Sequence, residues 1–318
     1  MIGIVILNYQ NWEDTFCCVQ SIWDNPPNES FQIILVDNAS PNMPEYDLDA
    51  MIQEYEILYI KNKENKGYNA GNNIGIAKAL EIKCDAILIS NNDVCFEQGS
   101  IQELYDCAKS DAKIGIVGPK ILDKNGVIQK SNLCRKTGMK EKYLVRTRLN
   151  AIFRHLYKTY FGFDRNYDTM YEVYAVLGCC FLMTRACAEA VTPLDEHPFL
   201  YEEELILGIT MEHAGFRTLY DPNAVIEHLH GGSTQHVKAF SFAHSVRSEI
   251  YYCRKYLHAT KAQILPLYWY RVGLYLIRCM RYEDFRKQWK WFRRMTKEEL
   301  DRSCLLYTSP SPRDGATS

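Results

Sequence analysis

The chain has 318 residues, of which 47% are hydrophobic, 13% are aromatic and 24% are charged, and its formal net charge is -2. This apolar and aromatic content excludes a disordered chain, and the near balance of Lys plus Arg (37) with Asp plus Glu (39) argues against a nucleic-acid binder. At roughly 150 residues per domain, the length allows one large domain or two modest ones.

Short apolar runs alternate with helical patterns along the first third of the chain. Apolar, β-branched runs separated by helices are typical of an α/β fold whose parallel sheet is covered on both faces. The predicted strands are Ile2–Leu7, Gln32–Val36, Glu56–Ile60, Ala86–Ser90 and Ile114–Val117. The predicted helices are Thr15–Trp23, Asp49–Glu54, Asn73–Leu80 and Ile101–Lys109.

Polar clusters follow three of these strands, at Asn8-Tyr9, Asp37–Ser40 and Asn91–Asp93. Open α/β sheets bind ligands beyond the carboxyl ends of their strands, so these clusters are candidate ligand contacts. The Asp37 carboxylate suits a ribose hydroxyl or a base N–H, and Asp93 suits a divalent cation that also binds a diphosphate. Alternatively, both residues only stabilise tight turns.

A segment rich in glycine and asparagine, residues 65–75 (NKGYNAGNNIG), precedes the third predicted helix. We expect a loop here, in which glycines give backbone N–H groups close access to a ligand and asparagine amides fix its position. No GK[ST] follows and no GxGxxG occurs, so the segment is neither a Walker loop nor a dinucleotide fingerprint.

The middle of the chain contains a hairpin signal and a basic segment. Asn125-Gly126 lies between apolar residues within Lys120–Gln129, which predicts a β-hairpin. Arg135–Lys158 has eight Lys or Arg residues and a single acid, Glu141. We expect this segment on the surface, as a solvated basic face or as one that attracts an anionic membrane or acceptor.

Three consecutive carboxylates, Glu202, Glu203 and Glu204, precede an apolar helical run. Acids stabilise a helix N-terminus, but successive helical residues diverge by about 100°, so one of them can act as a general base while the others cap the helix or bind an acceptor. Further along the chain, His228 and His230 precede two glycines. They are either metal ligands or ordinary polar residues.

Residues from Phe240 to Arg302 have a helical pattern, and Arg254–Arg302 contains thirteen Lys or Arg residues against five acids, interleaved with Trp and Tyr. Such helices lie in a membrane interface or pack on the domain with their basic face in water. Ile264–Met280 carries two arginines and does not suit a bilayer span. Because a strand pattern begins at Ile2, we expect no signal peptide.

Two further features concern the cysteines and the end of the chain. Twelve cysteines without a CxxC pair suggest reduced thiols of a cytosolic protein rather than a zinc site. Cys304–Ser318 resembles a translated sequencing-adapter tail, so we exclude it from the fold and expect the true C-terminus to be missing.

Taken together, these motifs resemble those of the family-2 glycosyltransferases of the GT-A fold. The similarity is greatest to the rhamnosyltransferase-like branch, and it covers roughly Ile2–Thr234. It is carried, in chain order, by NYQN, VDNAS, NKGYNAGNNIG, the strand-end Asp93, GPKIL, FLYEEEL, AGFRTLYDP and HLHGGST. The resemblance implies a mixed, mostly parallel sheet flanked by helices over residues 1–234, with a basic insertion at about 135–160 and a C-terminal extension of amphipathic, basic helices over residues 235–303.

The same resemblance implies roles for individual residues. Glu204 takes the position of the general base, beside Glu203, and Asp93 and His228 take positions that hold Mg²⁺ or Mn²⁺. The implied nucleotide-sugar contacts are Asn8, Asp37, Asn38, Asn65, Gly67, Asn72, Asn92 and Asp93. The implied acceptor-side residues are Gly178, Asp195 and Glu202.

Two positions depart from the family pattern. Asn91 stands where the family's DxD motif has its first acid, and Ile206 stands where the family has a later Asp. The first change removes a negative charge and should weaken metal binding, and the second leaves fewer acceptor contacts.

The implied activity is inverting transfer of a sugar, with rhamnose as one candidate, from a UDP- or dTDP-sugar to a hydroxyl of a surface-polysaccharide or lipid-linked glycan. We expect the protein in the cytoplasm, with possible peripheral contact at the inner face of the plasma membrane. One alternative is a non-catalytic nucleotide-sugar-binding or scaffold protein, because Asn91 weakens the DxD motif. A nucleotidyltransferase is the other, although its basic, Gly-rich loop is absent after the first strand, where Asn8–Asn11 stand.

Overall fold

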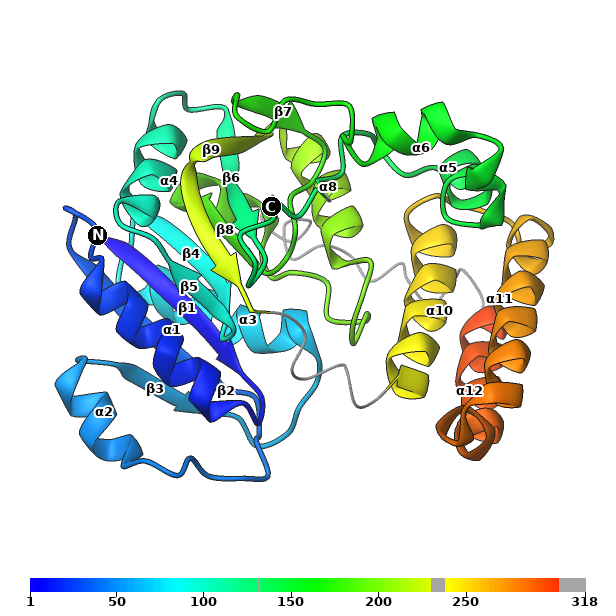
Figure 1. Cartoon of the computed structure of the whole chain (residues 1–318), viewed down its shortest axis with the longest axis horizontal. Coiled ribbons are helices and arrows are strands. Elements are labelled where there is room, and N and C mark those ends of the chain that lie inside the picture. The colour runs from blue at the N-terminus through cyan, green and yellow to red at the C-terminus, as the bar shows by residue number, and fades with distance from the viewer. Residues whose placement is uncertain (131, 230–237, 303–318) are drawn as a thin grey trace, which may run out of the picture.

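The computed structural model describes residues 1–130, 132–229 and 238–302. Its centre is a nine-stranded sheet in the order β3-β2-β1-β4-β8-β6-β9-β5, with β7 paired to β9 (Figure 1). The strands are β1 (Ile2–Asn8), β2 (Phe31–Asp37), β3 (Leu58–Lys61), β4 (Ala86–Asn91), β5 (Val94–Phe96), β6 (Ile114–Leu122), β7 (Tyr171–Val173), β8 (Cys180–Thr184) and β9 (Arg217–His228). Since β8 runs antiparallel between β4 and β6, the sheet is mixed.

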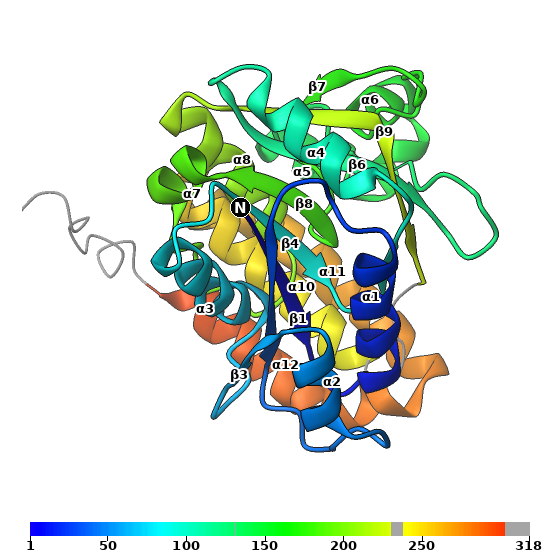
Figure 2. The same cartoon turned by 90° about the vertical axis from the view of Figure 1, so that its left-hand side faces the viewer.

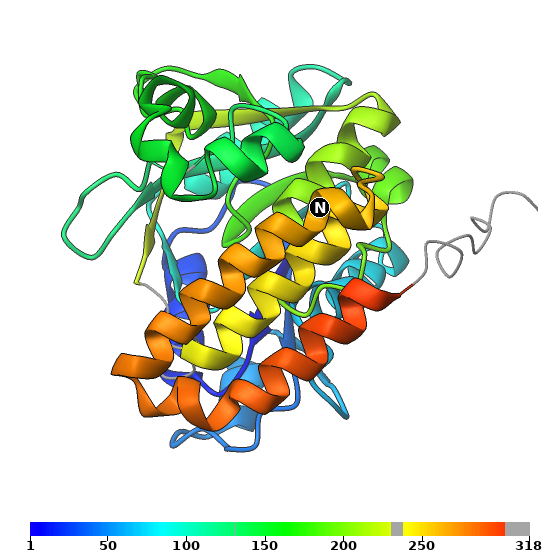
Figure 3. The ribbon, with the colours of Figure 1, turned by 90° about the vertical axis from the view of Figure 1, so that its right-hand side faces the viewer.

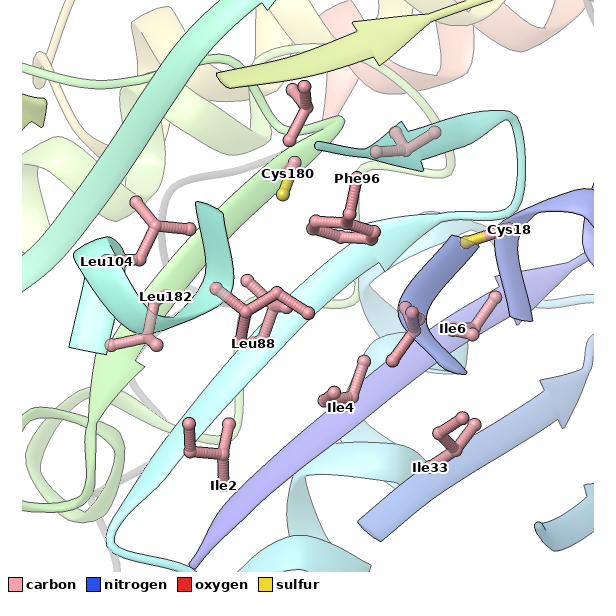
Figure 4. Close-up of a cluster of buried hydrophobic side chains, with 14 of the residues drawn as sticks. Ile2, Ile4, Ile6, Cys18, Ile33, Leu88, Phe96, Leu104, Cys180 and Leu182 are labelled. Atoms are coloured by element: carbon pink, nitrogen blue, oxygen red, sulfur yellow. The ribbon is translucent and has the colours of Figure 1, made fainter. Parts of the chain in front are cut away.

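The central strands are buried on both faces. Ile2, Ile4 and Ile6 of β1 pack into one hydrophobic cluster, whereas Val5 between them packs into another on the opposite face. Figure 4 shows the first cluster, in which these isoleucines lie beside Leu88 of β4. Successive side chains of a strand point to opposite faces, so a continuous apolar run suits a strand covered on both sides.

Helices cover the two faces of the sheet (Figure 2). The first cluster includes residues of α1, α2 and α4, and the second includes residues of α3, α7 and α8. The helices before residue 215 are α1 (Trp12–Asp24), α2 (Leu48–Glu54), α3 (Tyr68–Glu81), α4 (Ser100–Lys109), α5 (Met139–Leu144), η1 (Arg148–Ala151), α6 (Arg154–Tyr160), α7 (Arg185–Val191) and α8 (Glu203–Ala214).

The C-terminal helices share a core with α8 and with the basic insertion. They are α10 (Lys238–Lys255), α11 (Lys261–Arg281) and α12 (Glu283–Asp301), and Figure 1 shows them together to one side of the sheet. A third cluster joins them to Leu205 and Ile209 of α8 and to Val145 and Tyr160 of the insertion. These helices therefore pack directly against the element that begins with Glu203 and Glu204.

Several predicted elements are confirmed, and three need correction. The hairpin is present, because Leu122 and Ile128 form an antiparallel bridge across the Asn125-Gly126 turn. The third strand begins at Leu58 instead of Glu56, because Glu56 has a φ of 48° and Ile57 N donates to Ile52 O at the end of α2.

The second correction concerns the third helix, which begins at Tyr68, five residues before the predicted Asn73. Most of the expected glycine- and asparagine-rich loop is therefore helical. Asn69 and Asn73 donate to the backbone oxygens of Asp195 and Leu194, so tertiary contacts hold residues of low helix propensity in a helix.

The third correction concerns the basic insertion, which we expected on the surface. Lys142 is 0% exposed, and Val145 and Tyr160 belong to the third core cluster. Paired acids and a hydrophobic surface from α10 and α11 hold this part of the insertion in the interior.

No helix among the described residues combines the length and apolar character that crossing a bilayer requires. His230, the GGST motif and Cys304–Ser318 lie outside the described residues.

Candidate active site

The sheet brings the strand-end residues to one edge. Asn8 pairs in register with Asp37 on β2, and Leu7 pairs with Asn91 on β4. Because these strands are parallel, their carboxyl ends meet, as the sequence predicts.

Both oxygens of the Asp37 carboxylate, at the end of β2, accept hydrogen bonds from nearby protein groups. Its Oδ1 accepts from Ser40 N at 2.9 Å, and its Oδ2 accepts from Tyr59 OH at 3.3 Å. Burial, together with the Asp37 charge, raises the pKa of Tyr59 to about 12, so this hydroxyl stays protonated as a donor. Asp37 thus holds the turn in this structure, and its side chain is 0% exposed.

Asn38 connects this turn to the start of α3. Its Nδ2 donates to Asn65 Oδ1 at 3.0 Å and to Gly67 O at 3.2 Å. Gly67 has a φ of +105°, and a Cβ there would lie 2.5 Å from Phe199 O. Only glycine allows this approach, so Gly67 joins the segment before α3 to the segment before α8.

Asn72 and Asn92 are both buried amides with different surroundings. Asn92 Nδ2 donates to Asn8 Oδ1 at 3.1 Å and to Asn11 O at 2.8 Å, so it ties β4 to the first βα turn. In contrast, Asn72 Oδ1 is buried without a hydrogen-bond partner among the described residues. A buried acceptor of this kind is costly unless a ligand or water satisfies it.

Asp93 and His228 face each other where β5 and β9 begin to pair. Val94 lies opposite His228, and His228 Nε2 is 3.3 Å from Asp93 Oδ1. A carboxylate and an imidazole are suitable ligands for Mn²⁺ or another divalent cation, so these residues fit a metal. However, the described residues contain no cluster of three or more His, Cys, Asp or Glu side chains, so the two would supply only part of a coordination shell.

A cavity of about 880 Å³ lies between α8, α7 and the end of α10. Glu203 and Glu204 line it together with Tyr68, Gly178 and Asp195. Gly178 N donates to Glu204 Oε1 at 3.3 Å, and Tyr68 OH donates to Gly178 O. The cavity therefore brings together the predicted catalytic pair and two predicted acceptor-side residues.

The two glutamates of the cavity are difficult to ionise. Burial, followed by the charge of Glu204, raises the pKa of Glu203 well above its usual range. Burial also raises the pKa of Glu204, although backbone N–H groups of Glu204 and Gly178 oppose the shift. Raised carboxyl pKa values bring a group closer to the working pH of a general base. Glu203 Oε2 is buried without a hydrogen-bond partner among the described residues.

The segment that precedes β8 lies near both Asp93 and Glu204. Asn91 N donates to Cys179 O at 2.8 Å, and Cys179 follows Gly178, the partner of Glu204. Burial, and then the charges of Asp93 and Glu204, raise the pKa of the Cys179 thiol, so both carboxylates act on this one group. Asn8, Asp37, Asp93 and His228 do not line the 880 Å³ cavity itself.

Glu202 points away from its two neighbours. Its carboxylate lies 2.5 Å from Lys142 Nζ, and it lines a second cavity of about 400 Å³ rather than the one lined by Glu203 and Glu204. Tyr201 and Glu202 both have a φ of 70°, and this left-handed turn separates the directions of the three acids. The expected divergence is confirmed, and Glu202 does not line the cavity of Glu203 and Glu204, so its acceptor-side role stays a prediction.

Asp195 holds the end of α10 against the cavity wall. Its Oδ2 accepts from the hydroxyls of Tyr251 and Tyr256, each at 2.6 Å, and from Lys255 Nζ at 2.9 Å. Burial alone would raise the pKa of Asp195, but these donors lower it below the usual range. Its carboxylate is thus bound to α10 while other atoms of the residue line the cavity.

Tyr68 and Lys142 are two residues of these sites that the sequence motifs do not predict. Tyr68 belongs to the NKGYNAGNNIG segment, but only the asparagines and glycines of that segment suggested ligand contacts. Burial and the charges of Glu203 and Glu204 raise the pKa of Tyr68, so its hydroxyl remains protonated beside both acids. Lys142 has no local sequence signal, because its burial depends on residues far along the chain.

Comparisons with known proteins concern the family and the fold of the chain. The sequence profile described as Glycosyl transferase family 2 matches residues 3–190. An N-acetylglucosaminyl-diphospho-decaprenol L-rhamnosyltransferase of Mycobacterium tuberculosis is 28% identical over 217 residues, which cover 64% of this chain and 67% of that protein. A low-salt glycan biosynthesis hexosyltransferase of Haloferax volcanii is 25% identical over 211 residues, which cover 64% of this chain and 59% of that protein.

Solved structures show the same fold. GalNAc-T7 with UDP, GalNAc and Mn2+ has a TM-score of 0.58 at 17% identity, covering 86% of this chain and 54% of that one. A mannosyltransferase of Pyrobaculum calidifontis in complex with GDP-Man and Mn2+ has a TM-score of 0.51 at 11% identity, covering 94% and 73%. This chain thus spans little more than half of GalNAc-T7, and the shared architecture is the GT-A fold expected from the sequence.

Proposed function

The chain belongs to glycosyl transferase family 2, and on that premise we propose that it moves a hexose from a UDP- or dTDP-sugar to a hydroxyl of a glycan or lipid-linked acceptor. Rhamnose is the first donor sugar to test, because a relative with 28% identity is an L-rhamnosyltransferase. That relative's name includes a decaprenol-linked diphosphate, which supports a lipid-linked acceptor here. Family membership disfavours the nucleotidyltransferase and scaffold alternatives.

The observation that supports the proposal most is the position of Glu204. Its Oε1 lies 3.3 Å from Gly178 N, in a cavity of about 880 Å³ that it shares with Glu203 and Tyr68. This volume is in the usual range for ligand sites and suits a sugar hydroxyl approaching the carboxylate. Glu204 is therefore the proposed general base, held in place by the Gly178 amide.

The proposed reaction is a single displacement. The acceptor oxygen forms a bond to the anomeric carbon as the bond from that carbon to the diphosphate breaks, and Glu204 takes the hydroxyl proton. A general base of this kind typically contributes 10²–10⁴-fold in rate. Because the acceptor attacks opposite the leaving group, the anomeric configuration inverts. Burial raises the pKa of Glu203, and a protonated Glu203 is suited to donate a hydrogen bond to the acceptor.

Asp93 and His228 are the proposed ligands of a divalent cation, Mg²⁺ or Mn²⁺. Bound there, the ion would supply stabilisation of the negative charge on the leaving diphosphate. Asn91 takes the place of an acid beside them, so this chain's own ligands offer less negative charge than a full DxD motif. Asn72, with its buried acceptor oxygen, is proposed to bind the donor. Asp37 is fully buried, so the contact with the nucleobase that we expect for it requires the turn after β2 to open.

The experiment that tests this function uses the full chain with a panel of UDP- and dTDP-sugars, with and without Mn²⁺. We expect one donor to raise the melting temperature, since ligands that bind only the folded state stabilise it by RT ln(1 + [L]/Kd). The same donor should support transfer to a lipid-linked glycan. If no nucleotide sugar changes the melting temperature and none is consumed, the proposal is wrong.

A further inference from the structure

The outward face of α11 is apolar along most of the helix. Between Ile264 and Met280, every exposed residue is apolar, and Trp269 and Met280 are 59% and 76% exposed. These exposed residues are Pro266, Trp269, Leu276, Ile277 and Met280. A helix on the surface of a globular protein normally has polar residues on this side.

The opposite face of α11 is buried in the protein core. Ile264, Leu267, Val272 and Tyr275 are buried there. At about 100° per residue, positions 269, 276 and 280 lie within about 40° of one another, on a different side of the helix from most of these buried residues. This stripe therefore belongs to a helix that is already folded and packed, and residues 1–130, 132–229 and 238–302 leave it exposed.

The basic insertion extends the apolar surface. Arg148 N donates to Tyr270 OH at 3.0 Å, which places η1 beside α11. Leu149, Ile152 and Phe153, at and just after η1, are all exposed. Figure 3 shows α11 beside the insertion helices and α12 on this side of the molecule. Exposed apolar side chains on two neighbouring elements of a folded chain are typical of an interaction site.

The exposed charges of the C-terminal helices and of the basic insertion are mostly positive. The exposed Lys and Arg residues of α10–α12 number nine, against three exposed acids. The bases are Lys238, Lys261, Arg281, Arg286, Lys287, Lys290, Arg293, Arg294 and Lys297, and the acids are Glu283, Glu298 and Asp301. In the described insertion between residues 135 and 158, every exposed charged residue is Lys or Arg.

We propose that α11 and the 148–153 segment dock this protein on an anionic lipid bilayer, with α11 in the plane of the interface. Its exposed side chains enter the apolar boundary, Trp269 occupies the headgroup level that Trp favours, and the basic residues contact anionic headgroups. A second copy of the chain is a poorer occupant, because two such faces would bring their positive charges together.

The position of this surface also suits the proposed reaction. Lys255 and Tyr256 at the end of α10 line the cavity that contains Glu204, and α11 begins only a few residues later. A lipid-linked acceptor would therefore enter next to the docked helix. This placement rests on the proposed function, whereas membrane docking itself does not, because it can be measured without turnover.

The test is co-sedimentation of the full chain with vesicles of phosphatidylethanolamine and phosphatidylglycerol, and with vesicles of phosphatidylcholine alone. We expect binding to the anionic vesicles, and at least about tenfold weaker binding to phosphatidylcholine or at high salt. Tryptophan emission should shift to the blue on binding, and Trp269→Phe should remove most of that shift.

Paired variants separate docking from folding. Leu276→Ser with Met280→Ser should weaken vesicle binding by about tenfold or more, without changing nucleotide-sugar binding. Met43→Ser with Val127→Ser is the matched control, because these two apolar residues are each 60% exposed outside this surface. Equal loss in both pairs, or no vesicle binding by the parent chain, overturns the proposal. So does a dimer in solution that the Leu276/Met280 pair dissociates.

Discussion

Lys142 Nζ lies 2.5 Å from Glu202 Oε2 in the protein interior, with the two side chains 0% and 4% exposed. Glu249 of α10 is the second acid near Lys142, at 3.6 Å, and Arg271 of α11 donates to both oxygens of Glu249. This chain of charges connects the insertion and the C-terminal helices to the residue directly before Glu203. The start of α8 is thus fixed by elements far from it in sequence.

Replacing Lys142 with Met should destabilise the protein by about 3–5 kcal/mol, because it leaves buried acids without their cation. Burial disfavours the charged lysine, but Glu202 and Glu249 raise its pKa, so it is ionised at neutral pH. Urea unfolding measures the change, with exposed Lys140→Met as control. Lys142→Met with Glu202→Gln should recover part of the loss. Equal stability of the single and double variants would show that the pair is uncoupled.

The ionisation of Glu299 should make the free energy of unfolding depend on pH. Glu299 accepts from His197 Nε2 at 2.8 Å and lies among Arg247, Arg254 and Arg302. Burial raises its pKa, but the hydrogen bond and charge of His197 and the arginine charges lower it to about 2, below the ordinary 4.5. Its contribution is therefore fully present above about pH 4.5 and is lost as the pH falls towards 2.

Glu299→Gln should consequently lower the free energy of unfolding at pH 7 by about 2–3 kcal/mol. The difference from the parent protein should shrink as the pH falls below 4.5. Urea titrations across this pH range provide the measurement, with the exposed neighbour Glu298→Gln as control. A difference that stays constant with pH would rule out the ion pairs as its cause.

Asp93 and His228 predict the response to metals. Asp93→Asn and His228→Gln should each weaken Mn²⁺ binding by about tenfold or more, measured as Mn²⁺-dependent stabilisation of the protein by UDP. Exposed Asp24→Asn is the matched control. EDTA should abolish both this stabilisation and transfer by the parent protein. Undiminished transfer in EDTA would show that the reaction does not need a metal ion.

The cavity glutamates predict the acid limb of the pH–rate profile. Since burial raises the pKa of Glu204 and a general base must be ionised, kcat/KM should fall on the acid side with an apparent pKa above the ordinary 4.5. The value belongs to the Glu203–Glu204 pair rather than to one residue. An acid limb at or below 4.5 would contradict a buried carboxylate base.

The strands and the strand-end polar residues could be predicted because their signals are local. Ile2–Asn8 is a continuous apolar run ending in Asn, and the parallel register then brings Asn8, Asp37 and Asn91 to one edge. The start of α3 could not be predicted from the sequence, because Asn69 and Asn73 are held in the helix by their contacts with residues 195 and 194.

The candidate site also combines residues that have a local sequence signal with residues whose position depends on distant contacts. The FLYEEEL motif predicts Glu203 and Glu204 as site residues, and helical geometry predicts that the three acids diverge. Which acid faces which cavity depends on Lys142, whose burial by α10 and α11 no local pattern reveals. Tyr68 was missed for a similar reason, since its role follows from its contact with Gly178, a residue 110 positions away.

The most direct test of the account is the Glu204→Gln variant, assayed for both sugar transfer and donor binding. A loss of about 10²–10⁴-fold in kcat/KM is expected, while the stabilisation by the donor nucleotide sugar stays unchanged. Glu189→Gln is the matched control, because Glu189 also lines the cavity and should retain activity. Transfer by Glu204→Gln at a rate close to that of the parent protein would contradict the central claim that Glu204 is the base.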